Sequence, residues 1–271
     1  MTQRYCFLIE YDGSPYKGWQ RQDHAPSVQG ALEQALTKLG EADKVVQGAG
    51  RTDAGVHALA QVAHVDLDRP WAPFRLMEAM NAHLRRGEDP VAINACAKVD
   101  DAFHARFSAT SRSYLYRIIA RRAPLTVERG RAWNVKADLD VEAMDEAAQC
   151  LVGEHDFTTF RSTECQAQSP IKTLDTLNVQ RAQYFGVDVI EITTHARSFL
   201  HSQVRSFAGA LKAVGEGRWD MDDMASALAA RDRAACAPVA PPHGLYLVKV
   251  GYTANAPGKE DAAAALTPRS A

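Results

Sequence analysis

The chain has 271 residues, of which 46% are hydrophobic and 24% are charged, and its formal net charge is −2. This composition is typical of a globular protein with enough apolar residues for one or two domains. No apolar run reaches the roughly 20 residues that span a bilayer, and residues 1–5 lack the apolar core of a signal peptide. We therefore expect a cytoplasmic protein with no membrane-bound part.

The first half of the chain is predicted to mix strands and helices. We expect strands at residues 4–11 and 58–66, and helices that follow Ser27 and that run from Pro73 to about Ala82. Apolar residues at helical spacing follow Ser27, whose hydroxyl suits a helix N-cap. Proline is favoured in the first helical turn, which places Pro73 at a helix start.

The second half continues the same mixture. The pattern predicts strands near residues 112–120, 171–182, 186–194 and 245–251, and helices near 140–152, 199–214 and 220–230. From Ala254 on, the chain is rich in alanine, proline and charged residues, which predicts a flexible tail at 254–271.

The five cysteines are widely spaced, and no two form a C-x-x-C pair: Cys6, Cys96, Cys150, Cys165 and Cys236. This spacing argues against a zinc or dithiol redox site. Reduced and mostly buried thiols are the simplest interpretation.

Residues 48–57, with the sequence GAGRTDAGVH, place one carboxylate in a loop of small residues. Asp53 follows Arg51 by two positions. A carboxylate beside a guanidinium stays ionised at neutral pH, which suits a nucleophile or a base. By spacing alone the alternative is an ordinary turn, in which the aspartate bonds local amides. Neither G-x-x-x-x-G-K-[ST] nor G-x-G-x-x-G is present, so a nucleotide cofactor loop is not indicated.

The string Gly-Arg-Thr-Asp-Ala-Gly-Val-His resembles the active-site signature of the tRNA pseudouridine synthase A family. Further blocks resemble this family in the family's order, at residues 10–13, 18–22, 103–110, 114–116, 153–161, 199–205 and 244–247. Together they extend from about residue 5 to residue 252. Two segments depart from the family pattern, namely residues 84–88 and Gln203, and they put local loop shape and helix packing in question.

The resemblance implies an α+β fold in which two related mixed α/β domains share a broad, mainly antiparallel sheet with a central active-site cleft. We expect an N-terminal α+β domain at residues 1–106, which carries the aspartate loop, and a C-terminal α+β domain at 107–253. Periodicity alone does not give this topology.

The resemblance also implies the reaction. The family isomerises uridine to pseudouridine at positions 38, 39 and 40 in the anticodon stem-loop of tRNA. The N1–C1′ bond breaks, the base turns over, and a C5–C1′ bond forms. No atoms are added and no redox change occurs, so no cofactor and no metal are expected. Relatives act as homodimers, and we expect a homodimer here.

Four residues match functional positions of the family. Asp53 matches the essential aspartate, which either attacks C1′ or deprotonates the ribose to give a glycal. Arg51 neighbours Asp53 or fills the space of the flipped nucleotide. Tyr114 matches the tyrosine that stacks on the target base, and its hydroxyl is suited to assist proton loss from C5. Arg205 matches the basic residue that pairs with the aspartate.

The assignments of Tyr114 and Arg205 have structural alternatives. Tyr114 is equally suited to a core, and Arg205 to an ordinary surface position at the flank of its helix. Strand alternation places Tyr114 and Tyr116 on one face, which we expect to border the cleft, while Leu115 packs into the core.

RNA binding is expected to depend on a local basic segment, because the net charge is slightly negative. Between Ala102 and Trp133 there are seven arginines, and Glu128 is the single acid. Within the matched blocks, the candidate RNA contacts are Arg21, Arg106, Arg112 and Arg161. The alternative for the basic segment is a solvated surface.

Two other functions would use different parts of this sequence. A non-catalytic protein that binds or folds tRNA would need the basic segment and not Asp53. A metal-dependent hydrolase would need clustered ligands, but His57 and His64 would point to opposite faces of one regular strand. His104 is suited either to cap a turn or to contact a phosphate.

Overall fold

The computed structural model describes residues 2–253, so the predicted tail at 254–271 lies outside the described residues. The chain divides into two compact units: Met1–Ser111 with the chain from Leu247 on, and Arg112–Tyr246. The chain passes from one unit to the other within two strands, β5 (Ala109–Ala120) and β10 (Leu245–Tyr252). The last strand lies next to β3 (His57–Leu67), and its residues from Leu247 on group with the first unit, whereas the sequence-based ranges placed the whole strand in the second domain.

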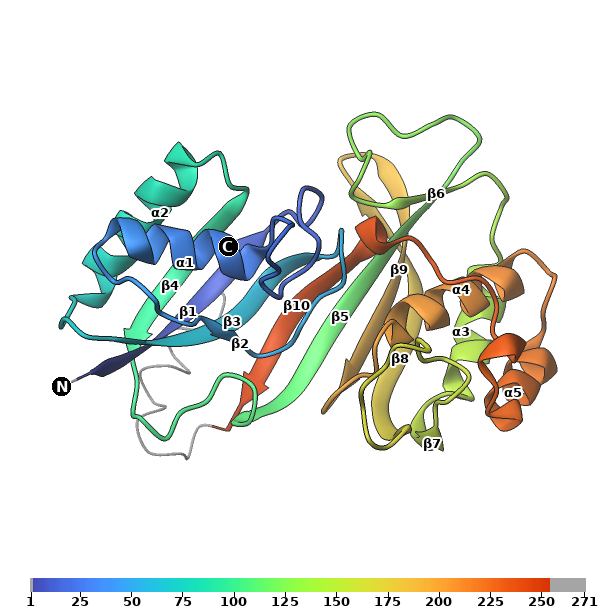
Figure 1. The fold of residues 1–271 in the computed structure, drawn as a ribbon. Helices are drawn as coiled ribbons and strands as arrows, with labels where there is room; N and C mark the ends of the chain where they lie inside the picture. Colours follow the sequence, from blue (N-terminus) through green and yellow to red (C-terminus); the bar gives the residue numbers. More distant parts are fainter. Residues whose placement is uncertain (1, 254–271) are drawn as a thin grey trace. The chain divides into compact units, whose positions relative to one another are not determined.

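The first unit has a sheet with the strand order β4-β1-β3-β10, and the short β2 pairs with β3. The other strands of this sheet are β1 (Gln3–Tyr11), β2 (Gln47–Gly48) and β4 (Val91–Lys98). β1 pairs with β3 and with β4 in antiparallel register. Helices α1 (Val28–Lys38) and α2 (Pro73–Arg86) lie together on one face of these strands (Figure 1).

Local signals in the sequence account for both helices. The Ser27 hydroxyl accepts a hydrogen bond from the Gly30 amide at 3.2 Å, which confirms the predicted N-cap of α1. Pro73 is the first residue of α2, as predicted. α2 extends past the expected end at Ala82 because Leu84 is buried in the core. Residues 84–86 of the unusual segment therefore complete this helix, and Gly87 is its C-cap.

Strand β4 was not predicted from the sequence. Val91 and Ile93 are buried and alternate with exposed residues, but small alanines dilute the pattern in the rest of the strand. The β1–β4 register shifts between Leu8 and Ile9. On the other side of β4, the Asn81 side chain donates to the Ile93 carbonyl and accepts from the Ile93 amide, at 2.9 and 2.8 Å. These bonds satisfy backbone groups that an edge strand would otherwise leave exposed.

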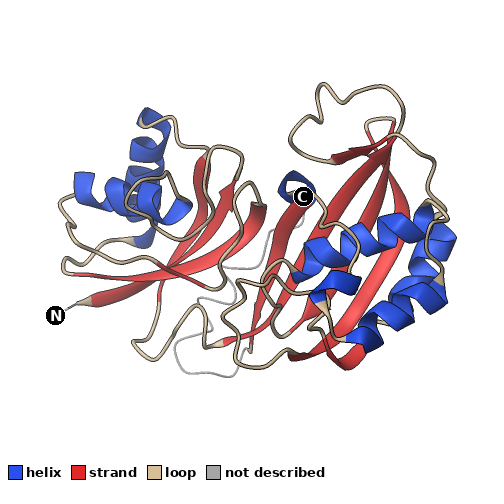
Figure 2. Ribbon diagram, turned by 45° about the vertical axis from the view of Figure 1, so that its right-hand side comes forward, coloured by secondary structure: helices blue, strands red, loops and turns tan. Residues whose placement is uncertain are grey.

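The second unit has the strand order β5-β9-β8-β7, and β6 pairs with β5 in parallel. Its elements besides β5 are β6 (Trp133–Val135), α3 (Val141–Gln149), β7 (Gly153–Asp156), β8 (Ile171–Tyr184), β9 (Val187–Ala196), α4 (Gln203–Gly215), α5 (Met221–Ala230) and short 3-10 helices at Arg233–Ala235 and Pro242–Gly244. The helices cover one face of the strands (Figure 2). Phe157, Phe160 and Phe207 are fully buried and contact one another edge to face, which forms the centre of this core.

Helix α4 begins at Gln203 and not at Phe199, where the sequence pattern placed its start. Ser202 adopts a left-handed conformation with φ 59°, which separates the preceding turn from the helix. The Gln203 side chain is buried and accepts a hydrogen bond from the Leu200 amide at 2.7 Å. This glutamine therefore closes the turn, which explains a polar residue at a position where the family usually has an apolar one.

The predicted α+β class with a mainly antiparallel sheet is confirmed, since every strand pairing described within the two units is antiparallel except that of β5 with β6. Among residues 2–253, no helix is both long and apolar enough to cross a membrane. All five cysteines are free thiols. The prediction that most are buried is wrong: only Cys6 is, and burial raises the pKa of its thiol to about 12.

Candidate active site

The loop that carries Asp53 leaves the sheet between β2 and β3. Gly48 pairs with Ala63 of β3, and the Ala49 amide donates to the Val62 carbonyl at 2.7 Å. The next carbonyl, that of Gly50, accepts a hydrogen bond from the Gln61 side chain at 2.8 Å. Gln61 is fully buried in β3, so the start of the loop is tied to the rigid interior of the sheet.

The end of β1 and the segment that follows it hold the middle of the same loop through hydrogen bonds. The Trp19 amide donates to the Thr52 carbonyl at 3.1 Å, and the Tyr11 and Thr52 hydroxyls lie 2.8 Å apart. The Gly55 amide donates to the Tyr16 carbonyl at 3.3 Å. Thr52, the residue before Asp53, is thus fixed through both its backbone and its side chain. The resembling blocks at residues 10–22 and 48–57 form one local structure.

Two glycines make this close contact between the segments possible. A Cβ atom on Gly13 would lie 2.0 Å from the Val56 carbonyl oxygen. A Cβ atom on Gly18 would lie 2.7 Å from the Thr52 carbonyl oxygen, and Gly18 has a φ of +99°, which L side chains rarely adopt. Only glycine fits at either position without displacing the backbone beside Asp53.

Asp53 is half-buried, whereas Arg51 is exposed and Thr52 is buried between them. The Val56 amide donates to the Asp53 carbonyl at 3.1 Å, which closes a turn directly after the carboxylate. A half-buried carboxylate on a fixed turn is reachable from solvent and is held in one place. Both properties are required of a nucleophile or base that acts on a bound substrate.

His57 anchors the end of the loop. It is buried, and its Nδ1 accepts a hydrogen bond from the Gly13 amide at 3.1 Å. The same nitrogen lies 3.2 Å from the Asp12 carboxylate. The bond from the Gly13 amide therefore ties the end of the loop to the segment that follows β1.

In the second unit, Tyr114 is half-buried on β5 and its ring meets Phe199 edge to face, with centroids 5.2 Å apart. Tyr116 is fully buried, packs edge-on against Trp133, and donates its hydroxyl to the Pro241 carbonyl at 2.8 Å. Leu115 is half-buried. The prediction that Tyr116 borders a cleft while Leu115 enters the core is therefore wrong, because the core of this unit lies on the tyrosine face of the strand.

Arg205 is half-buried on α4. Its Nε donates to the Ala240 carbonyl at 2.9 Å, and the Ala240 amide donates back to the Arg205 carbonyl at 3.1 Å. The first bond orients the guanidinium, and the second ties the backbone of α4 to the same residue. Asp53 belongs to the first unit and Arg205 to the second, so their ion pair stays a prediction, as does the approach of Tyr114 to Asp53.

The candidate RNA-contacting arginines each have contacts within their own unit. Arg21 forms an ion pair with the buried Glu33 at 2.8 Å, and Arg112 donates to the Arg197 carbonyl at 2.9 Å. The Arg106 guanidinium lies 5.7 Å from the centroid of the Phe107 ring. Arg161 is half-buried in the turn that follows β7, where its amide donates to the Thr158 carbonyl at 3.5 Å. RNA contact by these arginines stays a prediction.

Sequence reasoning missed Gln61 and Tyr11 as residues that position the Asp53 loop. Gln61 carries a usable signal, because a polar residue in the apolar strand His57–Leu67 needs a buried hydrogen-bond partner. Tyr11 lies within a matched block, but its contact with Thr52 spans 41 residues of sequence and has no local signature.

We expect His64, on β3, to make the stability of the protein depend on pH. It is buried, and its Nδ1 accepts from the Ala105 amide at 3.2 Å. Burial, with the nearby His104 and Arg4, lowers the pKa of His64 to about 4. Protonation therefore favours the unfolded chain as the pH falls from about 6.5 towards 4. We expect the free energy of unfolding to drop by about 2–3 kcal/mol between pH 7 and 4.5 from this group.

Urea unfolding at the two pH values measures this effect. His64→Gln keeps an acceptor for the Ala105 amide and removes the titration, so its loss between pH 7 and 4.5 should be smaller by most of that amount. An equal loss in the variant and the wild type would show that His64 is not responsible.

Comparison of the sequence with known proteins identifies the family of this chain. A family model described as tRNA pseudouridine synthase matches residues 8–108 and 147–253. The chain belongs to this family, and the predicted resemblance is confirmed. Among its curated relatives is tRNA pseudouridine synthase A of Jannaschia sp. (strain CCS1), 60% identical over 92% of this chain and 95% of the relative.

Two further relatives with the same description are similar over as much of the chain. The protein of Roseobacter denitrificans (strain ATCC 33942 / OCh 114) is 57% identical over 92% of this chain and 95% of its own length. That of Brucella ovis (strain ATCC 25840 / 63/290 / NCTC 10512) is 58% identical over 92% and 98%. Among solved structures, a Cbf5-Nop10-Gar1 complex aligns with a TM-score of 0.35 at 10% identity, over 90% of this chain and 49% of that one. That similarity is too low to inform the site.

Proposed function

We propose that this protein isomerises uridine to pseudouridine in tRNA and that Asp53 carries the reaction. The supporting observation is that Asp53 lies half-buried on a loop whose backbone is hydrogen-bonded to β3 and to the segment that follows β1, in a chain that matches the synthase family over most of its length. A carboxylate that is fixed in advance loses little freedom when substrate binds.

The reaction needs this carboxylate and no cofactor. The N1–C1′ bond breaks, the base turns, C5 bonds to C1′, and the hydrogen on C5 leaves as a proton. The reaction is redox-neutral and adds no atoms, so we propose no cofactor. Asp53 acts either by attack on C1′ or by deprotonation of the ribose to give a glycal, and both routes require an ionised aspartate.

The remaining roles follow the family resemblance. Tyr114 stacks on the target base and assists proton loss from C5, and the edge-on contact with Phe199 holds its ring in one orientation. Arg51 is exposed, which suits a side chain that fills the space of a flipped nucleotide. Arg205 pairs with Asp53, and its bond to Ala240 orients the guanidinium for that role.

The finer assignment is that the substrate is the anticodon stem-loop, at uridines 38, 39 and 40, and that a cytoplasmic homodimer acts on it. Neighbouring sites with different sequences require recognition by backbone and shape. The test is to incubate unmodified tRNA with the pure protein and to map pseudouridine. We expect it at these three positions. Pseudouridine only elsewhere in tRNA would contradict the position, and tRNA that binds without any pseudouridine would favour the non-catalytic alternative.

The loop between β5 and β6 is a candidate surface for tRNA phosphates (Figure 1). Its exposed arginines are Arg121, Arg122, Arg129 and Arg131. Its single acid, Glu128, is paired with Arg117 at 3.0 Å. The loop therefore presents positive charge that its own acid does not cancel.

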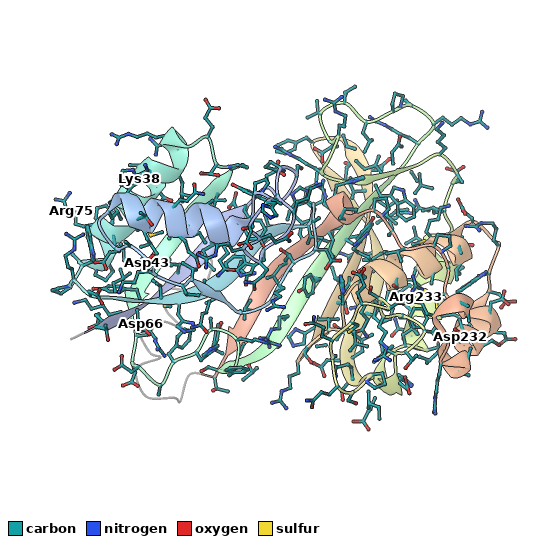
Figure 3. All side chains as sticks on the ribbon, viewed as in Figure 1. Lys38, Asp43, Asp66, Arg75, Asp232 and Arg233 are labelled. Carbon is teal, nitrogen blue, oxygen red and sulfur yellow. The ribbon has the colours of Figure 1, made fainter. Side chains whose placement is uncertain are left out.

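We expect Arg121→Gln with Arg122→Gln to weaken tRNA binding and to make it less dependent on salt. Each phosphate contact that is lost should lower the slope of log affinity against log salt by about 0.7–0.9. The matched control removes two exposed arginines of α2, Arg75→Gln with Arg86→Gln; Arg75 is labelled in Figure 3. Equal changes in the slope for the two pairs would exclude a special role for the β5–β6 loop.

A further inference from the structure

Phe107 is a large aromatic side chain that is 76% exposed. It lies in a tight turn that the proposed chemistry does not use. The Ser108 amide donates to the His104 carbonyl at 2.9 Å, and the His104 amide donates to the Ser108 hydroxyl at 3.0 Å. These reciprocal bonds fix the turn, so Phe107 is held at the surface by a rigid backbone.

His104 supports one face of the Phe107 ring. The two ring centroids are 4.3 Å apart and the planes differ by 35°. The His104 Nδ1 accepts from the amides of Arg106 and Phe107, at 3.1 and 3.3 Å, so the proton of the neutral ring is on Nε2. That nitrogen donates to the Gln47 side chain at 3.0 Å. The imidazole is therefore fixed through both nitrogens.

The surroundings of this ring pair are positively charged. The Arg106 guanidinium lies 5.7 Å from the Phe107 ring centroid. Burial lowers the pKa of His104, and the charges that lower it further are those of Arg4 and Arg106. Arg4 is paired with Asp66 at 2.7 Å, whereas Arg106 is exposed beside the Phe107 ring.

The residues that flank Phe107 along the chain are Arg106 and Ser108, and both are polar. A stable protein interface buries about 1,200–2,000 Å² around an apolar centre. One rigid ring beside a guanidinium matches instead an unpaired nucleobase, which stacks on the ring while its phosphate meets the cation.

We propose that Phe107, supported by His104 and flanked by Arg106, is a stacking platform for an unpaired base of the RNA substrate. This inference rests on the proposed function and adds a binding contact that is separate from the bond-making step at Asp53. Arg106 holds the phosphate beside the stacked base.

Binding of unmodified tRNA in the Asp53→Asn background tests the platform without turnover. Phe107→Leu keeps apolar bulk and removes the aromatic face, so affinity should fall about 5- to 150-fold. Phe107→Trp keeps a stacking surface and should bind within about threefold of the parent. The matched control is Phe74→Leu, because Phe74 on α2 is also exposed, at 63%, and should leave affinity unchanged. Equal melting temperatures confirm that each variant is folded.

The tryptophan variant also reports stacking directly. Saturating tRNA should quench the emission of Phe107→Trp more than that of the parent, whose other tryptophans are the same. If Phe107→Leu binds tRNA as tightly as Phe74→Leu, the stacking proposal is wrong. Pseudouridine formation by the wild type, measured in parallel, would then still support the proposed function. If the wild type makes no pseudouridine while Phe107→Leu still weakens binding, the proposed function fails and the platform holds.

Discussion

Asp53→Asn should lower the rate of pseudouridine formation by about 10⁴-fold or more, because removal of a residue that makes or accepts the reacting bond has effects of this size. The amide is nearly the same size and shape as the carboxylate, but it neither attacks C1′ nor accepts a proton from the ribose. Single-turnover measurement of pseudouridine in tRNA, with enzyme in excess, isolates the chemical step. We expect tRNA affinity to stay within about threefold of wild type, since the loop is held by Thr52, Gln61 and Tyr16.

The matched control is Asp43→Asn. Asp43 is an exposed aspartate of the same unit with a φ of 58°, a conformation that asparagine also tolerates (Figure 3). This variant should retain wild-type activity. Activity of Asp53→Asn within tenfold of the Asp43→Asn control would exclude Asp53 as the essential carboxylate.

Gly13→Ala should both destabilise the protein and impair catalysis. The added Cβ would lie 2.0 Å from the Val56 carbonyl oxygen, which is backbone and has no rotamer to yield. We expect the free energy of unfolding to fall by about 1–3 kcal/mol, as for other overpacked interiors. Relief of the clash moves the segment that follows Asp53, and a displacement of about 1 Å in a reacting group can cost 10²-fold in rate.

Urea unfolding and single-turnover kinetics measure the two effects of Gly13→Ala. The control is Gly50→Ala in the Asp53 loop, where a Cβ would meet nothing within 4 Å. Its free energy of unfolding should change by less than about 1 kcal/mol. If both variants lose the same stability, the close approach of Gly13 to Val56 does not determine the packing of the loop.

The sequence predicted those elements whose signals are local. A hydroxyl before an apolar helical pattern located α1, and a proline located the start of α2. The start of α4 was misplaced because the turn depends on the buried Gln203 side chain, which apolar periodicity does not detect. The burial of Tyr116 was also missed, since strand alternation says which residues share a face but not which face meets the helices.

A short sequence string was enough to predict the candidate site. The hydrogen bonds that hold the Asp53 loop in place could not be predicted in this way. The residues that resemble the family signature lie together around Asp53, so one loop was enough to locate it. The contacts that hold this loop join Tyr11 to Thr52 and Gln61 to Gly50, and the first pair is 41 residues apart. Such long-range hydrogen bonds leave no periodic trace in the sequence. The turn that exposes Phe107 on His104 is local, but it required the side-chain geometry to be recognised.

The most direct test of a uridine isomerase at Asp53 is tritium release from unmodified tRNA made with [5-³H]uridine. Bond formation from C5 to C1′ expels the hydrogen on C5, so the wild-type protein should release one tritium to water for each pseudouridine formed, without change in the mass of the unlabelled RNA. The Asp53→Asn protein should release none at the same concentration. Wild-type protein that releases no tritium, or Asp53→Asn protein that releases as much as wild type, would contradict the central claim.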